Sequence, residues 1–146
     1  KVNIREHIGK IIKKALILIT LIKKKNIIML FPEFKKSLVE LSDIDLQRKL
    51  WLNIDNNTGL ISSYSELFNS LFSDFDFDYE IKDLEDDKLK QNLQKLKVML
   101  EEYKEPYPFD FKENWDDSII LNDSRWLEIV NFAKNIINDI NENPLE

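Results

Sequence analysis

The first apolar residues of the chain recur at the spacing of an α-helix, i, i+4, i+7 and i+8, with lysines mostly on the opposite side. Between Ala15 and Ile22 every residue except Thr20 is apolar, so the apolar stripe almost surrounds the helix. We therefore predict that residues 1–28 form a basic helix buried between others. Two alternatives stay open: a basic helix that lies on a membrane surface, and translation upstream of a true start at Met29.

Two helix-start signals follow. Pro32 suits the first turn of a helix, which we expect over residues 33–41. Ser42 with Asp45 three residues later is a variant of the capping box and predicts the start of the next helix. Residues 53–59 are rich in turn-forming residues, so we expect that helix to end there.

Three further helices are predicted in the remainder of the chain. Ser63 followed by Glu66 is a full capping box. The most regular pattern repeats leucine at intervals of three and four from Leu89 to Leu100, and the prolines that follow end this helix. Asp123 is expected to cap the last helix. The apolar stripe of that helix consists of Trp126, Val130, Ala133, Ile137 and Ile140.

Two segments mix acidic with aromatic residues and break the helical period. Residues 74–81 alternate acidic and apolar side chains strictly, which is the period of a β-strand. We predict a short extended segment there, or a loop that turns its rings inward. Residues 109–117 form a second acidic-aromatic stretch.

Composition also favours helices. The chain has 146 residues, of which 43% are hydrophobic, with nine phenylalanines, two glycines and no cysteine. Scarce glycine argues against the many tight turns of a sandwich or barrel, and the lack of cysteine fits the cytoplasm. We predict a single all-α domain over residues 1–146, a bundle of five or six helices with acidic-aromatic loops.

Charge is divided between two parts of the chain. Residues 1–28 carry eight basic and one acidic side chain, a net of +7, whereas residues 29–146 carry 13 basic and 26 acidic side chains, a net of −13. Such an acidic body opposes nucleic acid and favours a basic protein partner. The apolar run over residues 15–22 is too short to span a membrane, and the lysines that follow it do not fit a secretion signal. We expect neither nucleic acid nor a membrane as partner, and the oligomeric state stays open.

The sequence offers little catalytic chemistry. His7 is the one histidine, and without cysteine the usual nucleophilic triads and dyads lack their members. We predict a protein that is not an enzyme and uses no cofactor. A calcium loop is an alternative, with ligand positions 1, 3, 5 and 12 taken by Asp74, Asp76, Asp78 and Glu85. Against it, Tyr79 occupies the position where such a loop needs glycine.

Three groups of residues carry a resemblance to a known family. They are Phe31-Pro32-Glu33-Phe34 with Leu41-Ser42-Asp43, Gln47-Arg48 and Leu50-Trp51; Tyr64, Leu67, Phe68, Leu71, Phe72 and Asp74; and Arg125-Trp126 to Ala133. Over about residues 31–140 the chain resembles a family of small, mostly uncharacterised bacterial helical proteins. Small acidic proteins of this kind are similar to immunity proteins of contact-dependent growth inhibition and other polymorphic toxin systems. The resemblance implies no catalytic residues, and residues 1–28 lie outside it.

We therefore predict an immunity protein that binds and neutralises a cognate toxin, expected to be a basic nuclease. The alternatives are a regulatory or adaptor module that binds protein without a toxin, and a calcium-responsive binder. The partner-binding residues are expected in the two acidic-aromatic segments. They are Asp76, Asp78, Tyr79, Glu80, Asp110, Trp115, Asp116 and Asp117.

Overall fold

The computed structural model describes residues 3–30, 32–74, 76–107 and 116–141, and of residues 22–30 only the backbone. Its elements are α1 (Ile4–Leu30), α2 (Pro32–Leu41), α3 (Ile44–Leu52), α4 (Tyr64–Asn69), the π-helical turn η1 (Ser70–Asp74), α5 (Phe77–Lys82), α6 (Asp87–Glu102), α7 (Asp117–Leu121) and α8 (Ser124–Asn141). No strand occurs among these residues, so the all-α prediction is confirmed. The described residues form eight α-helices rather than five or six, because short helices replace the predicted loops.

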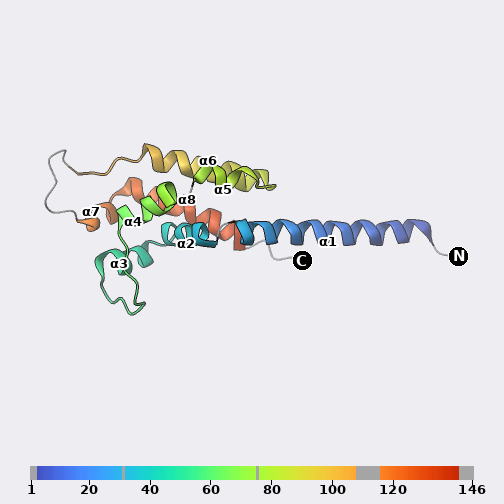
Figure 1. The fold of residues 1–146 in the computed structure, drawn as a ribbon, viewed down its shortest axis with the longest axis horizontal. Coiled ribbons are helices and arrows are strands. Elements are labelled where there is room, and N and C mark those ends of the chain that lie inside the picture. The colour runs from blue at the N-terminus through green and yellow to red at the C-terminus, as the bar shows by residue number, and fades with distance from the viewer. Residues whose placement is uncertain (1–2, 31, 75, 108–115, 142–146) are drawn as a thin grey trace.

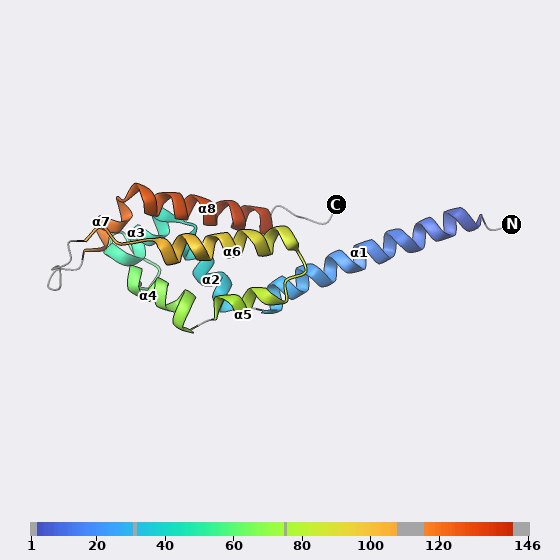
Figure 2. The same cartoon turned by 90° about the horizontal axis from the view of Figure 1, so that it is seen from above.

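The helices divide into a body and an arm. The body comprises α2 to α8: α2 packs on α8, α8 on α6, and α6 on α5, while α3 contacts α7 (Figures 1 and 2). The arm is α1, which extends away from the body as one long helix and carries the N-terminus far from it (Figures 1 and 2).

Side-chain caps fix where the body helices begin. Ser63 Oγ accepts a hydrogen bond from the Glu66 N–H at 3.1 Å, so the predicted cap of α4 is confirmed. The cap of α3 is Asp43 rather than Ser42: its Oδ1 accepts from the N–H groups of residues 45 and 46, both at 3.0 Å. Ser42 instead donates its hydroxyl to the Val39 carbonyl at 2.8 Å and closes the end of α2.

The strand period over residues 74–81 is not realised, because residues 77–82 form α5. Asp76 caps this helix by accepting from the Tyr79 N–H at 3.1 Å. Phe77 and Ile81 are buried, and their spacing of four residues suits a helix as well as a strand. The cap and this shared spacing explain why the strict alternation was misleading.

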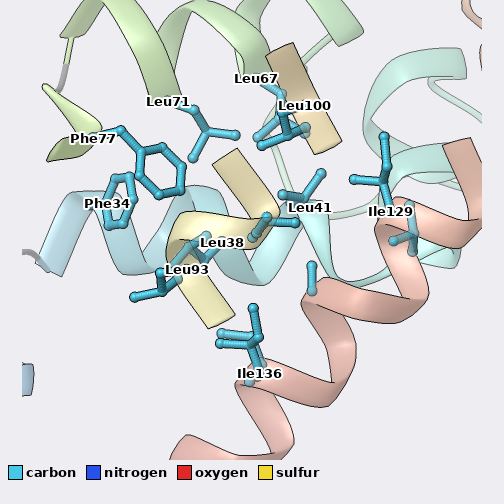
Figure 3. Packing of buried hydrophobic residues seen from close by; sticks show 14 of the residues in the cluster. Phe34, Leu38, Leu41, Leu67, Leu71, Phe77, Leu93, Leu100, Ile129 and Ile136 are labelled. Atoms are coloured by element: carbon cyan, nitrogen blue, oxygen red, sulfur yellow. The ribbon is translucent and has the colours of Figure 1, made fainter. Parts of the chain in front are cut away.

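The core lies between α2, α6 and α8 and is covered by α4 and α5. Figure 3 shows Phe34 and Leu38 of α2 facing Leu93 of α6, with Phe77 of α5 beside them. The rings of Phe34 and Phe77 meet edge to face with centroids 4.9 Å apart. Ile136 brings α8 into the same cluster (Figure 3).

An aromatic cluster forms the second half of the core. Trp126 of α8 is buried, and the ring centroids of Tyr103, Tyr64 and Trp51 lie 5.2, 5.3 and 6.0 Å from it. Rings at these separations contribute stability beyond their buried area. Gln47 is fully buried beneath the cluster and receives the indole N–H of Trp126 on its Oε1 at 2.9 Å.

The prediction that the first helix is buried between others is wrong. The apolar side chains of α1 that are described are exposed, from 44% for Ile17 to 72% for Ile4. The spacing of the apolar residues predicted the helix. It could not indicate whether the other helices would pack against it. Within the described part of the chain, no helix is both long enough and apolar enough to cross a membrane.

Replacement of Leu96, which lies on α6 and is fully buried, tests the core. We expect Leu96→Ala to lower the free energy of unfolding by about 2–5 kcal/mol, because it removes buried methyl groups and leaves a cavity. Val98→Ala on the same helix is the control, since Val98 is 47% exposed and should change stability by less than about 0.5 kcal/mol. Urea unfolding measures both, and equal losses would contradict this core.

Alkaline pH should destabilise the protein through its buried tyrosine, Tyr64. Burial, and then the neighbouring Glu105 carboxylate, raise the pKa of Tyr64 well above its ordinary value. Above about pH 10 the unfolded chain loses this phenol proton while the folded chain keeps it, so stability should fall as pH rises. Tyr64→Phe should show a shallower decline between pH 10 and 12, whereas Tyr79→Phe, at an exposed ring, should follow the unaltered protein. The same slope in all three proteins would refute this assignment.

Candidate protein-binding groove

A groove of about 500 Å³ opens on the body between α2, α3, η1 and the loop that joins α3 to α4. We call it the acidic groove. It is lined by Glu33, Lys36, Ser37, Glu40, Leu46, Leu50, Thr58, Leu60, Ser70 and Asp74.

Helix α2 supplies one wall. Its lining residues, Glu33, Lys36, Ser37 and Glu40, follow one another at helical spacing and therefore share a face. The hydroxyls of Ser37 and Ser70 are hydrogen-bonded to each other, which joins this wall to η1. The two walls are thus held together at the base of the groove, where Ser37 is buried.

The π-helical turn supplies the opposite wall. Residues 70–74 continue α4 with the wider π geometry. Single π turns inside helices occur frequently at functional sites, because they change the direction in which the following side chains project. Here the turn contributes Ser70 and Asp74 to the groove.

The loop between α3 and α4 forms the outer rim. Asn53, Asp55 and Gly59 all have positive φ, at 51°, 48° and 75°, so the backbone turns sharply in a short distance. The Asn56 amide donates to the Leu60 carbonyl at 2.6 Å and fixes the turn. Leu60 remains 65% exposed at the rim, where it offers apolar surface to a partner.

The charge of the groove is negative. It contains three carboxylates, Glu33, Glu40 and Asp74, and one ammonium, Lys36, for a formal net of −2. Lys36 lies 2.6 Å from Glu33 and so is already paired. Glu40 accepts the Trp51 indole N–H at 2.8 Å, whereas the carboxylate of Asp74 makes no hydrogen bond or ion pair with the described residues. The arrangement suits a cationic side chain whose alkyl stem contacts Leu46, Leu50 and Leu60.

Four of the predicted partner-binding residues lie on or beside α5, directly after Asp74 in the chain. Asp76 caps the helix, and Asp78 pairs with Lys97 of α6 at 2.9 Å. Tyr79 is 62% exposed, with the Lys82 ammonium 3.9 Å from its ring centroid. Burial, and then Asp76, raise the pKa of the half-buried Glu80. These residues continue the acidic sequence that begins at Asp74, on a helix that packs on α6.

The second predicted segment divides differently. Asp117 is buried and accepts the Tyr64 N–H at 3.3 Å, so it holds α7 against α4 and is not a surface residue. Asp116 caps α7 by accepting from the Ser118 N–H at 2.9 Å, and hydrogen bonds from Ser118 lower its pKa. Asp110 and Trp115 lie outside the described residues. We therefore remove Asp117 from the candidate surface.

The calcium-loop alternative is not supported by the local geometry. Residues 77–82, which would form the middle of the loop, are helical, whereas a calcium loop needs a sharp turn there. In the described part of the chain, no three histidine, cysteine, aspartate or glutamate side chains are grouped as metal ligands.

Sequence analysis did not identify Glu33, Glu40 or the rim of the groove. Glu33 and Glu40 lie among other polar residues of α2, and any helix face that is exposed to solvent shows such a pattern. A π turn has no recognised sequence signal, so the opening between η1 and α2 could not be expected. The turn-forming residues of 53–59 were the one signal that pointed toward the rim.

Comparison with protein-family models, with curated proteins and with solved structures finds no match to this chain. The resemblance to immunity proteins therefore stays a prediction. Any function has to be argued from the residues and geometry of the chain itself.

Proposed function

We propose that this protein is an immunity protein that binds a cognate bacterial toxin, a basic nuclease, and blocks it in the cytoplasm. The observation that carries the proposal is the acidic groove, a concave site with net negative charge and an exposed apolar rim. A nuclease must attract phosphate and so presents a basic surface. An acidic protein can cover that surface and exclude the nucleic acid.

The groove can hold one cationic side chain of a partner. An arginine or lysine of the toxin would place its charged end at Asp74 and Glu40 and its alkyl stem along Leu46 and Leu50. Charged hydrogen bonds of this kind are stronger than neutral ones, and a desolvated arginine is a frequent hot spot of protein interfaces. The exposed Leu60 would exclude water from the rim.

The remaining acidic residues would act at longer range. Residues 29–146 carry a net charge of −13, and the acidic side chains of α5 lie next to the groove in the chain. Such a charge raises the rate at which a basic partner arrives, and added salt weakens the effect.

A binding role is favoured over catalysis by the residue types available. The chain holds no cysteine, and its one histidine, His7, lies on the exposed arm rather than in the groove. A regulatory or adaptor protein would share the acidic surface, so the two binding roles differ only in whether the partner is toxic.

Products of the genes beside this one provide the test of the role. Each is expressed in a bacterial host with and without this protein, and growth is measured. We expect one basic product that stops growth alone, is tolerated when this protein is present, and co-purifies with it. A neighbour that binds but is harmless alone would favour the adaptor alternative and contradict the immunity role.

Three isosteric replacements test the site: Glu40→Gln, Asp74→Asn and Asp76→Asn. Each removes a charge, and the new side chains at positions 40 and 76 can still accept the hydrogen bonds made there. With the toxin identified above, we expect the triple variant to associate about tenfold more slowly at low salt, with the difference fading at about 0.5 M salt.

A control triple removes the same number of charges elsewhere on the body, through Glu102→Gln, Glu128→Gln and Asp139→Asn on α6 and α8. It should slow association by less than about twofold, because these exposed side chains lie outside both the groove and the start of α5 that follows it in the chain. Equal slowing by both triples would show that the groove is not the binding site. Stopped-flow mixing measures both rates.

A further inference from the structure

The arm carries an unusual amount of exposed apolar surface. Nine large apolar side chains of α1 are exposed, and none of them belongs to the core cluster of the body. They are Ile4, Ile8, Ile11, Ile12, Leu16, Ile17, Leu18, Ile19 and Leu21. Figures 1 and 2 show that α1 projects from the bundle, so no body helix covers this surface.

The apolar residues of α1 change from a stripe to a ring along the helix. In residues 4–15 they fall at positions 4, 8, 11, 12 and 15, on one side of the helix, and leave the other side to Lys10, Lys13 and Lys14. In residues 16–21 every residue except Thr20 is apolar, so the apolar surface goes round the helix. A partner helix covers only a narrow seam, whereas a lipid surface can accommodate a broad apolar arc.

The charge of the arm indicates which lipid surface fits. Residues 1–28 carry a net charge of +7, and their one acid, Glu6, is paired with Lys10 at 2.7 Å. We propose that α1 lies on an anionic lipid surface, with its apolar residues at the boundary between headgroups and acyl chains and its lysines among the headgroup phosphates. This proposal goes beyond the immunity function and does not depend on it.

The same charge argues against a second copy as the covering partner. Two α1 helices packed along their apolar stripes would bring together two segments that each carry a net charge of +7, and this repulsion disfavours pairing. Anionic headgroups instead attract each nearby lysine or arginine, by about 1 kcal/mol. The cytoplasmic leaflet has this anionic character.

The separation of arm and body lets opposite charges act independently. A helix of 27 residues is about 40 Å long, which is several times the Debye length of about 8 Å at physiological salt. The acidic body therefore does not cancel the attraction of the far lysines, and it can face the solution while α1 lies on the membrane. The expectation of no membrane partner rested on an apolar run too short to span a bilayer, and a helix that lies on the surface does not need to span it.

Vesicle flotation with the full chain tests the proposal. The probes are vesicles of phosphatidylcholine alone and of phosphatidylcholine with an equal amount of phosphatidylglycerol, at about 0.1 M salt. We expect the protein to float with the anionic vesicles at least tenfold more strongly than with the neutral ones. Failure to float with anionic vesicles would overturn the proposal.

Two sets of replacements separate charge from apolar contact. Lys10→Gln, Lys13→Gln and Lys14→Gln together should weaken anionic-vesicle binding at least tenfold, whereas the matched body triple Arg48→Gln, Lys49→Gln and Lys134→Gln should leave it within twofold. Unchanged binding in the arm triple would contradict the charge argument.

Ile8→Asn with Ile12→Asn removes apolar contact and should abolish flotation while the body keeps its thermal midpoint, since α1 lies outside the core. Sedimentation of the unaltered protein should show no dimer that this pair of replacements dissolves. A dimer of this kind would show that a second copy of the chain covers the apolar residues of α1, and it would overturn the proposal.

Discussion

One buried amide, that of Gln47, fixes how the helices of the body meet. Its Nε2 donates to the carbonyls of Glu40 and Leu41, both at 2.9 Å, and its Oε1 accepts the Trp126 indole N–H at 2.9 Å. The two carbonyls belong to the last turn of α2. That of Leu41 has no partner within the helix, whereas that of Glu40 also accepts the Asp43 N–H at 3.3 Å. A buried polar group without a partner costs about 1–3 kcal/mol, so α2, α3 and α8 are held in the one arrangement that satisfies all these groups.

This arrangement also determines the acidic groove. Its walls come from α2 and α3, and the Gln47 amide joins the end of the first to the start of the second. Trp51 extends the connection, since its ring lies 6.0 Å from that of Trp126 and its N–H reaches Glu40 in the groove. Gln47, Trp51, Tyr64 and Trp126 all belong to the three groups of residues on which the predicted family resemblance rests. In this chain they meet in one buried cluster, which gives them a structural role.

The parts of this fold that were predictable from sequence are those with a local cause. Ser63 and Asp123 accept hydrogen bonds from the backbone at the starts of α4 and α8, and the leucine repeat of α6 is buried as expected. The strand prediction for the segment of α5 was wrong because the spacing of Phe77 and Ile81 fits both the strand and the helical period. The exposure of α1 and the opening of the groove depend on how distant elements pack, which spacing along the chain does not report.

A double-mutant cycle between Gln47 and Trp126 tests this account most directly. Gln47→Leu leaves the indole N–H without an acceptor, Trp126→Phe leaves the amide oxygen without a donor, and the double variant removes both groups. If the amide fixes the arrangement of α3 and α8, the double variant should lose about 1–2 kcal/mol less stability in urea unfolding than the sum of the single losses. Losses that add to within about 0.3 kcal/mol would show that the two side chains are not coupled and would contradict the central role of Gln47.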